Sequence, residues 1–268
     1  MSKSSPDREL RLLELEPSPL ETDGLSTQIG TLHNVGSSEG AHRITHYLVK
    51  TQQISSYIFT GFLGIHWFTT GIFPLFGDAE ATDSSLLLSR VIYQNDVIEP
   101  CLVLGSVGAH IVSGVALRII RRVKQYNKYG RVIWFRDLGI LQGSGYLLIP
   151  MVAIHFSIVR LLPLIRDGGS ESIGIGFLAH GFVQLKYLSW FMYPALAIVG
   201  TFHVAQGWAR WKGYPKNWKS RVVCLATVVS GVWLTSVIRI SRIGRAVGHL
   251  GRHYDDFYNA ILSLSSVA

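Results

Sequence analysis

The stretch "GTFHVAQGWARW", residues 200–211, decides how the chain is interpreted. It places His203 in an apolar run that ends in a basic, tryptophan-rich edge. Aromatic and cationic side chains gather where hydrocarbon meets water, and ionisable groups inside the membrane are functional candidates. The stretch therefore predicts the end of a membrane-spanning helix that carries an imidazole within the bilayer.

Composition extends this interpretation to the whole chain. Its 268 residues are 48% hydrophobic and only 16% charged, which is unusual for a soluble domain of this size. A helix needs roughly 20 apolar residues to cross the hydrocarbon core. Five stretches meet that length: 54–76, 97–120, 138–165, 187–209 and 221–240. The predicted fold is all-α, an integral membrane bundle of five transmembrane helices, with kinks at Pro150 and Pro194.

The remaining sequence forms two tails around this bundle. Residues 1–46 are polar and predicted to be disordered, residues 47–243 form the five-helix domain, and residues 244–268 form a basic, amphipathic tail suited to a membrane surface. The first 23 residues lack the apolar core of a secretory signal, and their acidic residues outnumber the basic ones. A matrix presequence is Arg-rich and acid-poor. If the protein is mitochondrial, the outer membrane is therefore expected.

Charge asymmetry predicts the orientation. Basic residues crowd the connections between the second and third spans and between the fourth and fifth, whereas the first loop, residues 77–96, is mostly acidic. The positive-inside rule then places the amino terminus in the cytosol. The net charge of +8 is attributed to topology and to anionic membrane lipids, and no nucleic-acid partner is expected.

Four histidines lie in four different predicted spans. At a rise of about 1.5 Å per residue, His110 and His203 lie roughly 10 to 12 Å from the basic edge, and His66 and His155 roughly 24 to 28 Å. Two pairs at two heights can ligate two stacked b-type haems through bis-histidine coordination of each haem iron. A single intramembrane histidine taken alone is more often a hydrogen-bonded packing residue, and that alternative stays open.

Small and cationic residues accompany the histidines. Gly114 and Gly207 each follow a histidine by four positions, so each lies on the same helical face and leaves a bare patch for a flat macrocycle. Close helix packing is an equally good explanation. Haem propionates could pair with arginines at the basic edge, although most of these charges are better explained by topology: Arg118, Arg121, Arg122 and Arg210. Three further histidines are expected at the surface: His180, His249 and His253.

Two longer stretches carry a family resemblance. "NKYGRVIWFRDLGILQGSGYLL" leads to His155, and "YPALAIVGTFHVAQGW" surrounds His203. With five spans and histidines at two levels, residues 50–240 resemble the di-haem cytochrome b membrane anchor of succinate dehydrogenases and fumarate reductases. That resemblance implies two haem b groups, one held by His110 and His203 and the other by His66 and His155.

The amino-terminal tail carries a second motif, "LRLLELEPSPLE", at residues 10–21. In an extended chain, Leu13, Leu15, Pro17 and Pro19 project to one side, and Pro-x-Pro favours an extended conformation that can add to a sheet edge or dock in a groove. A short amphipathic turn of helix on the membrane is the alternative.

This motif resembles the one through which adaptors recruit the bridge-like lipid-transfer protein of the vacuolar-sorting class. Together with the five spans, the chain resembles a family of fungal mitochondrial outer-membrane adaptors, first described as complementing an outer-membrane assembly defect, which act in lipid homeostasis at membrane contact sites. The resemblance implies that the partner-binding residues are Leu10, Leu13, Leu15, Pro17 and Pro19.

Three functions follow as expectations. The first is an adaptor that catalyses no reaction, with the spans as its anchor and the tail as its recruiting segment. The second is a di-haem b-type electron-transfer protein linked to quinone. The third, suggested only by polar grooves between kinked helices, is lipid handling such as scrambling. The first two are compatible, because bound haem can stabilise the body of an adaptor.

Overall fold

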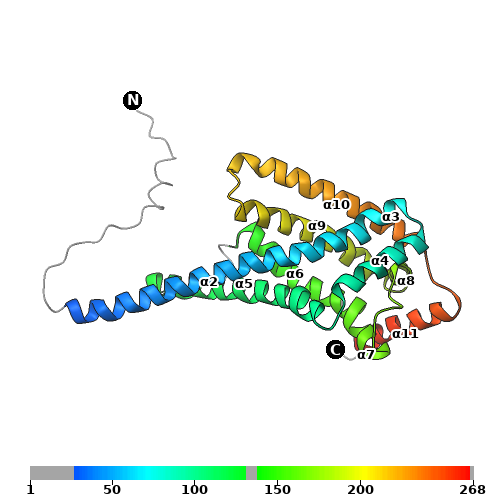
Figure 1. Ribbon diagram of the computed structural model, residues 1–268, viewed down its shortest axis with the longest axis horizontal. Helices are drawn as coiled ribbons and strands as arrows, with labels where there is room; N and C mark the ends of the chain where they lie inside the picture. Colours follow the sequence, from blue (N-terminus) through cyan, green and yellow to red (C-terminus); the bar gives the residue numbers. More distant parts are fainter. Residues whose placement is uncertain (1–26, 131–137, 266–268) are drawn as a thin grey trace. The chain divides into compact units, whose positions relative to one another are not determined.

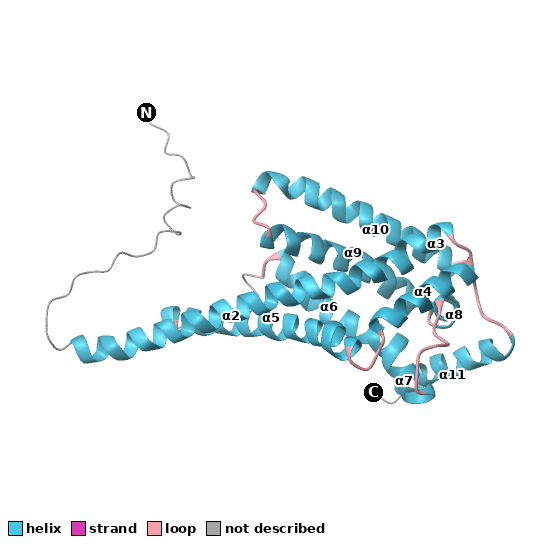
Figure 2. Cartoon of the chain, in the orientation of Figure 1, coloured by secondary structure: helices cyan, strands magenta, loops and turns pink. Residues whose placement is uncertain are grey.

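The computed structural model describes residues 27–130 and 138–265, and within these ranges every regular element is helical (Figures 1 and 2). The chain divides into two compact units, Met1–His46 and Tyr47–Ala268. The first helix crosses this division, because it begins at Thr27, inside the segment predicted to be disordered. All packing described below belongs to the second unit.

The elements follow one another with short connections. In chain order they are α2 (Thr27–Trp67), η1 (Phe68–Ile72), α3 (Phe73–Phe76), α4 (Ala79–Tyr93), η2 (Glu99–Leu104), α5 (Gly105–Tyr129), α6 (Ile140–Phe156), η3 (Ser157–Leu161), α7 (Leu162–Asp167), α8 (Ile175–Gln184), α9 (Lys186–Trp211), η4 (Lys216–Trp218), α10 (Lys219–Ser241) and α11 (Gly248–Ser265). The elements η1, η2 and η3 are π-helical turns, and η4 is a 3₁₀ turn.

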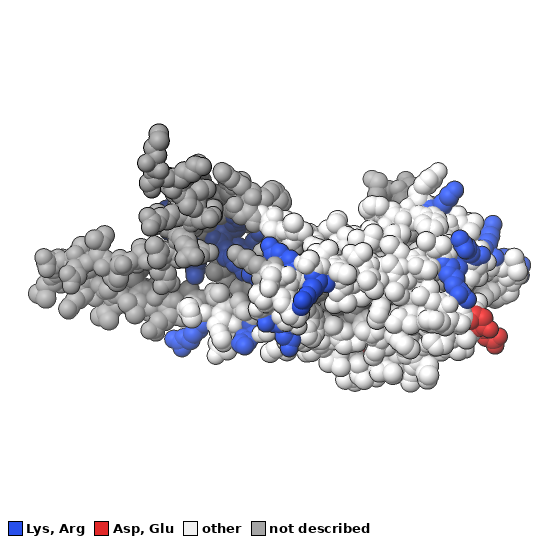
Figure 3. All heavy atoms as spheres, turned by 90° about the horizontal axis from the view of Figure 1, so that it is seen from above, with Lys and Arg blue, Asp and Glu red and all other residues white. Residues whose placement is uncertain are grey.

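Within residues 27–130 and 138–265, five helical stretches are long and apolar enough to cross a membrane: His42–Phe76, Glu99–Tyr129, Ile140–Asp167, Lys186–Trp211 and Lys219–Ser241. They confirm the predicted all-α membrane bundle. Their outward faces carry large apolar side chains, such as Val112 at 67% and Phe191 at 64% exposure. In Figure 3, lysine and arginine gather toward the two ends of the visible surface, and the middle is free of charged side chains. An exposed apolar belt of this kind is stable when lipid acyl chains cover it.

Each π-helical turn lies beside a proline. η1 precedes Pro74, η3 precedes Pro163, and η2 contains Pro100. A proline lacks an N–H and crowds the carbonyl four residues earlier, and a wider turn relieves this conflict in a membrane helix. The N–H of Phe73 accordingly bonds to the carbonyl of Phe68, five residues back. By contrast, Pro150 and Pro194, the predicted kinks, lie inside the continuous helices α6 and α9.

Helix α9 is central to the bundle. It packs against α6, α8 and α10, and α10 in turn contacts η1, α3 and α8. Small polar residues line these contacts and bond to carbonyls of their own helix one turn back, as Ser230 does to Ala226. Ser236 reaches across and donates to the carbonyl of Gly71. Small residues of this kind let membrane helices approach closely.

The short helix α8 and the carboxy-terminal helix α11 form an aromatic cluster at one end of the unit. Phe177 is fully buried and contacts Tyr254, Phe257 and Tyr258, with ring centroids 4.7 to 6.0 Å apart. The expectation that His180 lies at the surface is wrong. It is fully buried, and its Nε2 lies 2.9 Å from Asp255 Oδ1 because α11 folds back over α8. Residues 248–265 therefore form a packed helix of the body.

Candidate functional site

The four intramembrane histidines meet in two pairs. The ring centroids of His110 and His203 are 6.2 Å apart, and those of His66 and His155 are 6.1 Å apart. The first two residues lie on α5 and α9 and are called the outer pair; the other two lie on α2 and α6 and are called the inner pair. The structure thus brings together the same residues that the two heights paired in the sequence.

Hydrogen bonds orient both rings of the outer pair. His110 Nδ1 lies 3.2 Å from the backbone carbonyl of Gln52, which can only accept. His203 Nδ1 lies 3.0 Å from the Ser144 hydroxyl oxygen, whose own hydrogen is donated to the carbonyl of Leu141. With Nδ1 as the donor, which the Gln52 carbonyl requires for His110 and the Ser144 hydroxyl allows for His203, each neutral ring keeps a lone pair on Nε2. A ring held through Nδ1 with its Nε2 unprotonated is the usual state of a metal-ligating histidine.

The inner pair lies in an apolar, aromatic environment. Nδ1 of His66 and Nδ1 of His155 are buried and have no hydrogen-bond partner among the described residues. Leaving such an atom unpaired costs about 1 to 3 kcal/mol. The ring of Phe62 stacks near His66 at 5.7 Å, and Trp233 lies at 6.0 Å. An unpaired Nδ1 is compatible with a ligand site and with packing, since Nδ1 of His180 in the aromatic cluster is also unpaired among the described residues.

Local backbone structure also singles out the inner pair. His66 is the last residue but one of α2 and lies two residues before the π-helical turn η1, and His155 lies two residues before η3. The hydroxyl of Thr70 donates to the carbonyl of His66 at 2.6 Å. π-helical turns inside α-helices occur frequently at functional sites. Both inner histidines therefore precede a widened turn of their own helix.

The pairs fit a haem iron in ligand type and spacing. An imidazole nitrogen lies about 2 Å from the metal that it binds, so two rings on opposite sides of one ion have centroids roughly 6 Å apart. Groups of three or more metal-ligating side chains do not occur in the described ranges, and a haem needs only two axial ligands from the protein. The cavity beside His155 is about 20 Å³, which is room for about one water, so the match at this pair extends to ligand type and ring separation and not to space for a macrocycle.

The two predicted glycines differ in their surroundings. A side chain at Gly207 would meet no atom within 4 Å, so the space beside it is open. A Cβ at Gly114 would lie 2.8 Å from Gln52 Nε2, so this patch is covered by a side chain. The expected bare patch is therefore present at one of the two positions. Gly145 of α6 was missed, although a Cβ there would lie only 2.9 Å from Cε1 of His203.

The arginines of the basic edge have varied surroundings. Arg118 lies over the ring of Tyr146, with 5.8 Å from Cζ to the centroid, and Arg122 donates to Gln125 Oε1 at 2.5 Å. Arg121 is exposed, and Arg210 lines a pocket described below. None of these contacts requires a propionate.

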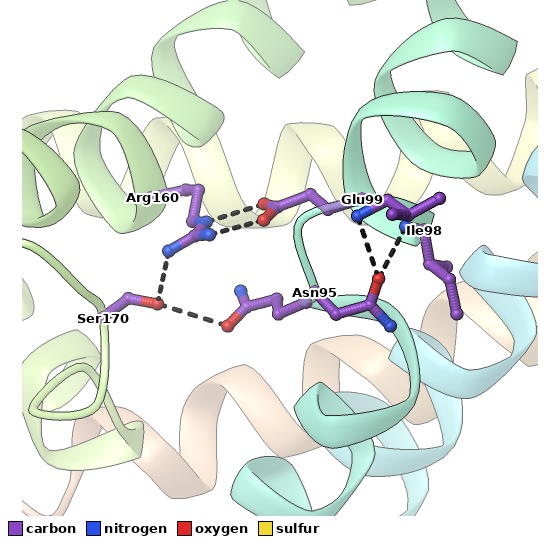
Figure 4. Close-up of polar contacts among 7 residues, drawn as sticks. Asn95, Ile98, Glu99, Arg160 and Ser170 are labelled. Carbon is purple, nitrogen blue, oxygen red and sulfur yellow. Dashed lines mark hydrogen bonds and ion pairs between the residues drawn. The ribbon is translucent and has the colours of Figure 1, made fainter.

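A polar cluster joins η2, η3 and the segment around Ser170 (Figure 4). Arg160 of η3 forms a two-pronged ion pair with Glu99 of η2, and its third nitrogen donates to the Ser170 hydroxyl at 3.2 Å. Ser170 donates in turn to Gln94 Oε1. The Arg90 guanidinium donates to the carbonyl of Ser170 at 2.8 Å, and burial lowers its pKa. Sequence analysis missed this cluster because its members are far apart along the chain.

The proposed partner-binding residues of the tail, Leu10, Leu13, Leu15, Pro17 and Pro19, lie outside the described residues. Their role stays a prediction.

Residues 150–246 match the family model of the transmembrane domain of MDM10-complementing protein 1. This match supports the family for the part of the chain that it covers. The matched stretch runs from the middle of α6 to the turn before α11 and contains His155 and His203, one member of each pair. No curated protein and no solved structure matches the chain. The resemblance to the cytochrome b anchor stays a prediction.

Proposed function

We propose that the protein is a multi-pass adaptor of the mitochondrial outer membrane, that its amino terminus is cytosolic, and that it acts in lipid homeostasis at membrane contact sites. The observation that carries the proposal is the match of residues 150–246 to the transmembrane domain of MDM10-complementing protein 1. The five spans supply the anchor.

In this proposal the tail recruits a bridge-like lipid-transfer protein through its Leu and Pro residues. The test is the double substitution Pro17→Ala and Pro19→Ala in the full chain, followed by imaging of that partner at mitochondria. Recruitment should be lost while membrane insertion is unchanged, because the restricted, extended Pro-x-Pro segment is removed. Pro6→Ala is the matched control and should recruit normally. Recruitment by a chain that lacks residues 1–25 would refute the adaptor assignment.

We further propose that the helical body binds two haem b groups, one at each histidine pair. Support comes from the centroid separations of 6.2 and 6.1 Å and from the free Nε2 atoms of the outer pair. Bound haem would supply one-electron redox chemistry. In an adaptor, binding would also stabilise the folded body by mass action.

Visible absorption of the purified protein tests this proposal. A b-type band that sharpens on dithionite reduction, with two haems per chain, is expected. His110→Leu with His203→Leu should leave one haem, and the control His249→Leu should leave both. Colourless protein that elutes as a single species would refute haem binding.

A di-haem electron-transfer protein is the second candidate, because two pairs at two heights could pass electrons across the membrane. If a quinol reduced the bound haem in intact vesicles, the electron-transfer function would be favoured. Loss of recruitment without loss of that reduction would separate the two functions.

A further inference from the structure

A second pocket lies at the basic end of the bundle, away from the histidines. It has a volume of about 230 Å³. It lies where α6 begins, α9 ends and α10 begins, and η4 connects the last two. The lining residues that matter most are Gln206, Arg210, Tyr214, Trp218 and Lys219. Among the described residues that line it, none is acidic.

Charge and backbone dipoles in this pocket both favour an anion. Arg210 and Lys219 bring two cations to it. Two helices, α6 and α10, begin at its wall, and neither has an acidic residue in its first turn or a side chain that caps its free N–H groups. Helix amino termini carry partial positive charge and bind phosphate groups readily. The pocket therefore has two cationic side chains in its lining and lies beside the starts of α6 and α10.

The other walls suit a lipid. Leu141, Ala209 and Val222 are apolar and come from three membrane-spanning helices. Tyr214 and Trp218 are 48% and 36% exposed, and their rings lie 4.8 Å apart. Aromatic rings of this kind lie at the headgroup level of a membrane. A pocket lined by both cationic and apolar side chains matches a phosphate attached to acyl chains better than a free phosphate ion.

We propose that this pocket binds the headgroup of an anionic glycerophospholipid of the surrounding membrane. The phosphate lies between Arg210 and Lys219, the amide of Gln206 donates to the glycerol ester region, and the acyl chains leave along Leu141 and Val222. This site goes beyond the adaptor and haem proposals and depends on neither, because no intramembrane histidine lines it.

The test uses the full chain in a neutral maltoside detergent. Dioctanoyl phosphatidic acid, dioctanoyl phosphatidylcholine and inorganic phosphate are titrated while tryptophan fluorescence is recorded, and native mass spectrometry counts bound lipid. Phosphatidic acid should bind at one saturable site, and the other two probes should not compete with it. Arg210→Gln with Lys219→Gln should weaken binding about thirty-fold, equivalent to about 2 kcal/mol for two cations.

The matched control is Lys186→Gln with Arg242→Gln. This variant also removes one lysine and one arginine, but from the other ends of α9 and α10. It should bind phosphatidic acid as tightly as the original protein does. Unchanged binding by the Arg210 and Lys219 double variant would overturn the proposal, as would an equal loss in the control or equal binding of phosphatidylcholine. If the double variant does not fold, hydrogen exchange decides: residues 206–222 should be protected by phosphatidic acid in the original protein, and unchanged exchange there would overturn the proposal.

Discussion

Removal of one charge from the Glu99–Arg160 pair should destabilise the bundle strongly. Their side chains are only 13% and 16% exposed, and the carboxylate receives both prongs of the guanidinium. Glu99→Gln keeps the shape but leaves the partly buried Arg160 without the carboxylate that binds it directly. Breaking a buried pair in this way costs about 3 to 5 kcal/mol. Because both groups keep some contact with solvent, we expect the lower limit, about 3 kcal/mol.

Arg160→Met tests the same contact from the other side and should cost a similar amount. The double variant, Glu99→Gln with Arg160→Met, no longer buries an uncompensated charge. Its loss should therefore be about 2 kcal/mol smaller than the sum of the two single losses, a coupling within the usual range for residues in direct contact.

Unfolding in mixed micelles of dodecyl maltoside and dodecyl sulfate, followed by the fluorescence of the seven tryptophans, measures these free energies. Asp96→Asn removes an exposed carboxylate from the same loop and should change stability by less than about 0.5 kcal/mol. A Glu99→Gln protein as stable as this control, or strictly additive single losses, would show that the pair does not hold η2 and η3 together.

Three further predictions concern the histidine pairs and the aromatic cluster. Gly145→Ala places a Cβ 2.9 Å from the His203 ring and should lower the haem content at the outer pair. Gly207→Ala is the control, because its Cβ meets nothing within 4 Å and the haem content should not change. Haem content per chain is measured by absorption, and an equal effect of the two substitutions would contradict the geometry. Phe177→Ala should destabilise the contact of α8 with α11 by about 3 kcal/mol, because a fully buried ring is removed, and limited proteolysis should then cleave α11 faster than in an Ile243→Ala control. Hydrogen bonds from Arg245 and, to a smaller extent, from His180 lower the pKa of Asp255 below its usual value of about 3.9. The docking of α11 should therefore be fully stable above about pH 4 and should weaken as the pH falls through the lowered pKa. Hydrogen exchange of α11 at pH 5 and pH 3 should show this loss, and Asp255→Asn should abolish the difference.

The five spans and the pairing of the histidines followed from the sequence for simple reasons. Length and hydropathy determine a membrane helix, and the rise per residue determines the height of a side chain along it. His110 and His203 could therefore be placed at one level without knowledge of packing. Which face each helix turns to its neighbours is a tertiary property, and Gly114 shows the limit, because Gln52 from another helix fills the space beside it.

Local and long-range details were less accessible. The sequence shows that Pro74 and Pro163 each lack an N–H and crowd the preceding turn. It does not show whether that turn stays α-helical or widens to a π-helical turn, as it does at η1 and η3. His180 was placed at the surface because it lies near the edge of a predicted span; in the structure it belongs to the ten-residue helix α8. Its burial depends on α11, about 70 residues later, which supplies Asp255. Contacts of that separation leave no periodic signal in the sequence.

The widened turns have a consequence for how sequences of this kind can vary. A π-helical turn accommodates one residue more than the α-helical path it replaces. Deleting one residue within Phe68–Ile72 would therefore return this turn to the α-helical path and leave the α3 segment facing α10 as before. The crowding between Pro74 and the carbonyl one turn earlier would then return, because the wider turn that relieves it is gone. A single deletion at η1 is thus expected to act locally, at the proline, and to leave the packing on both sides of the turn in place.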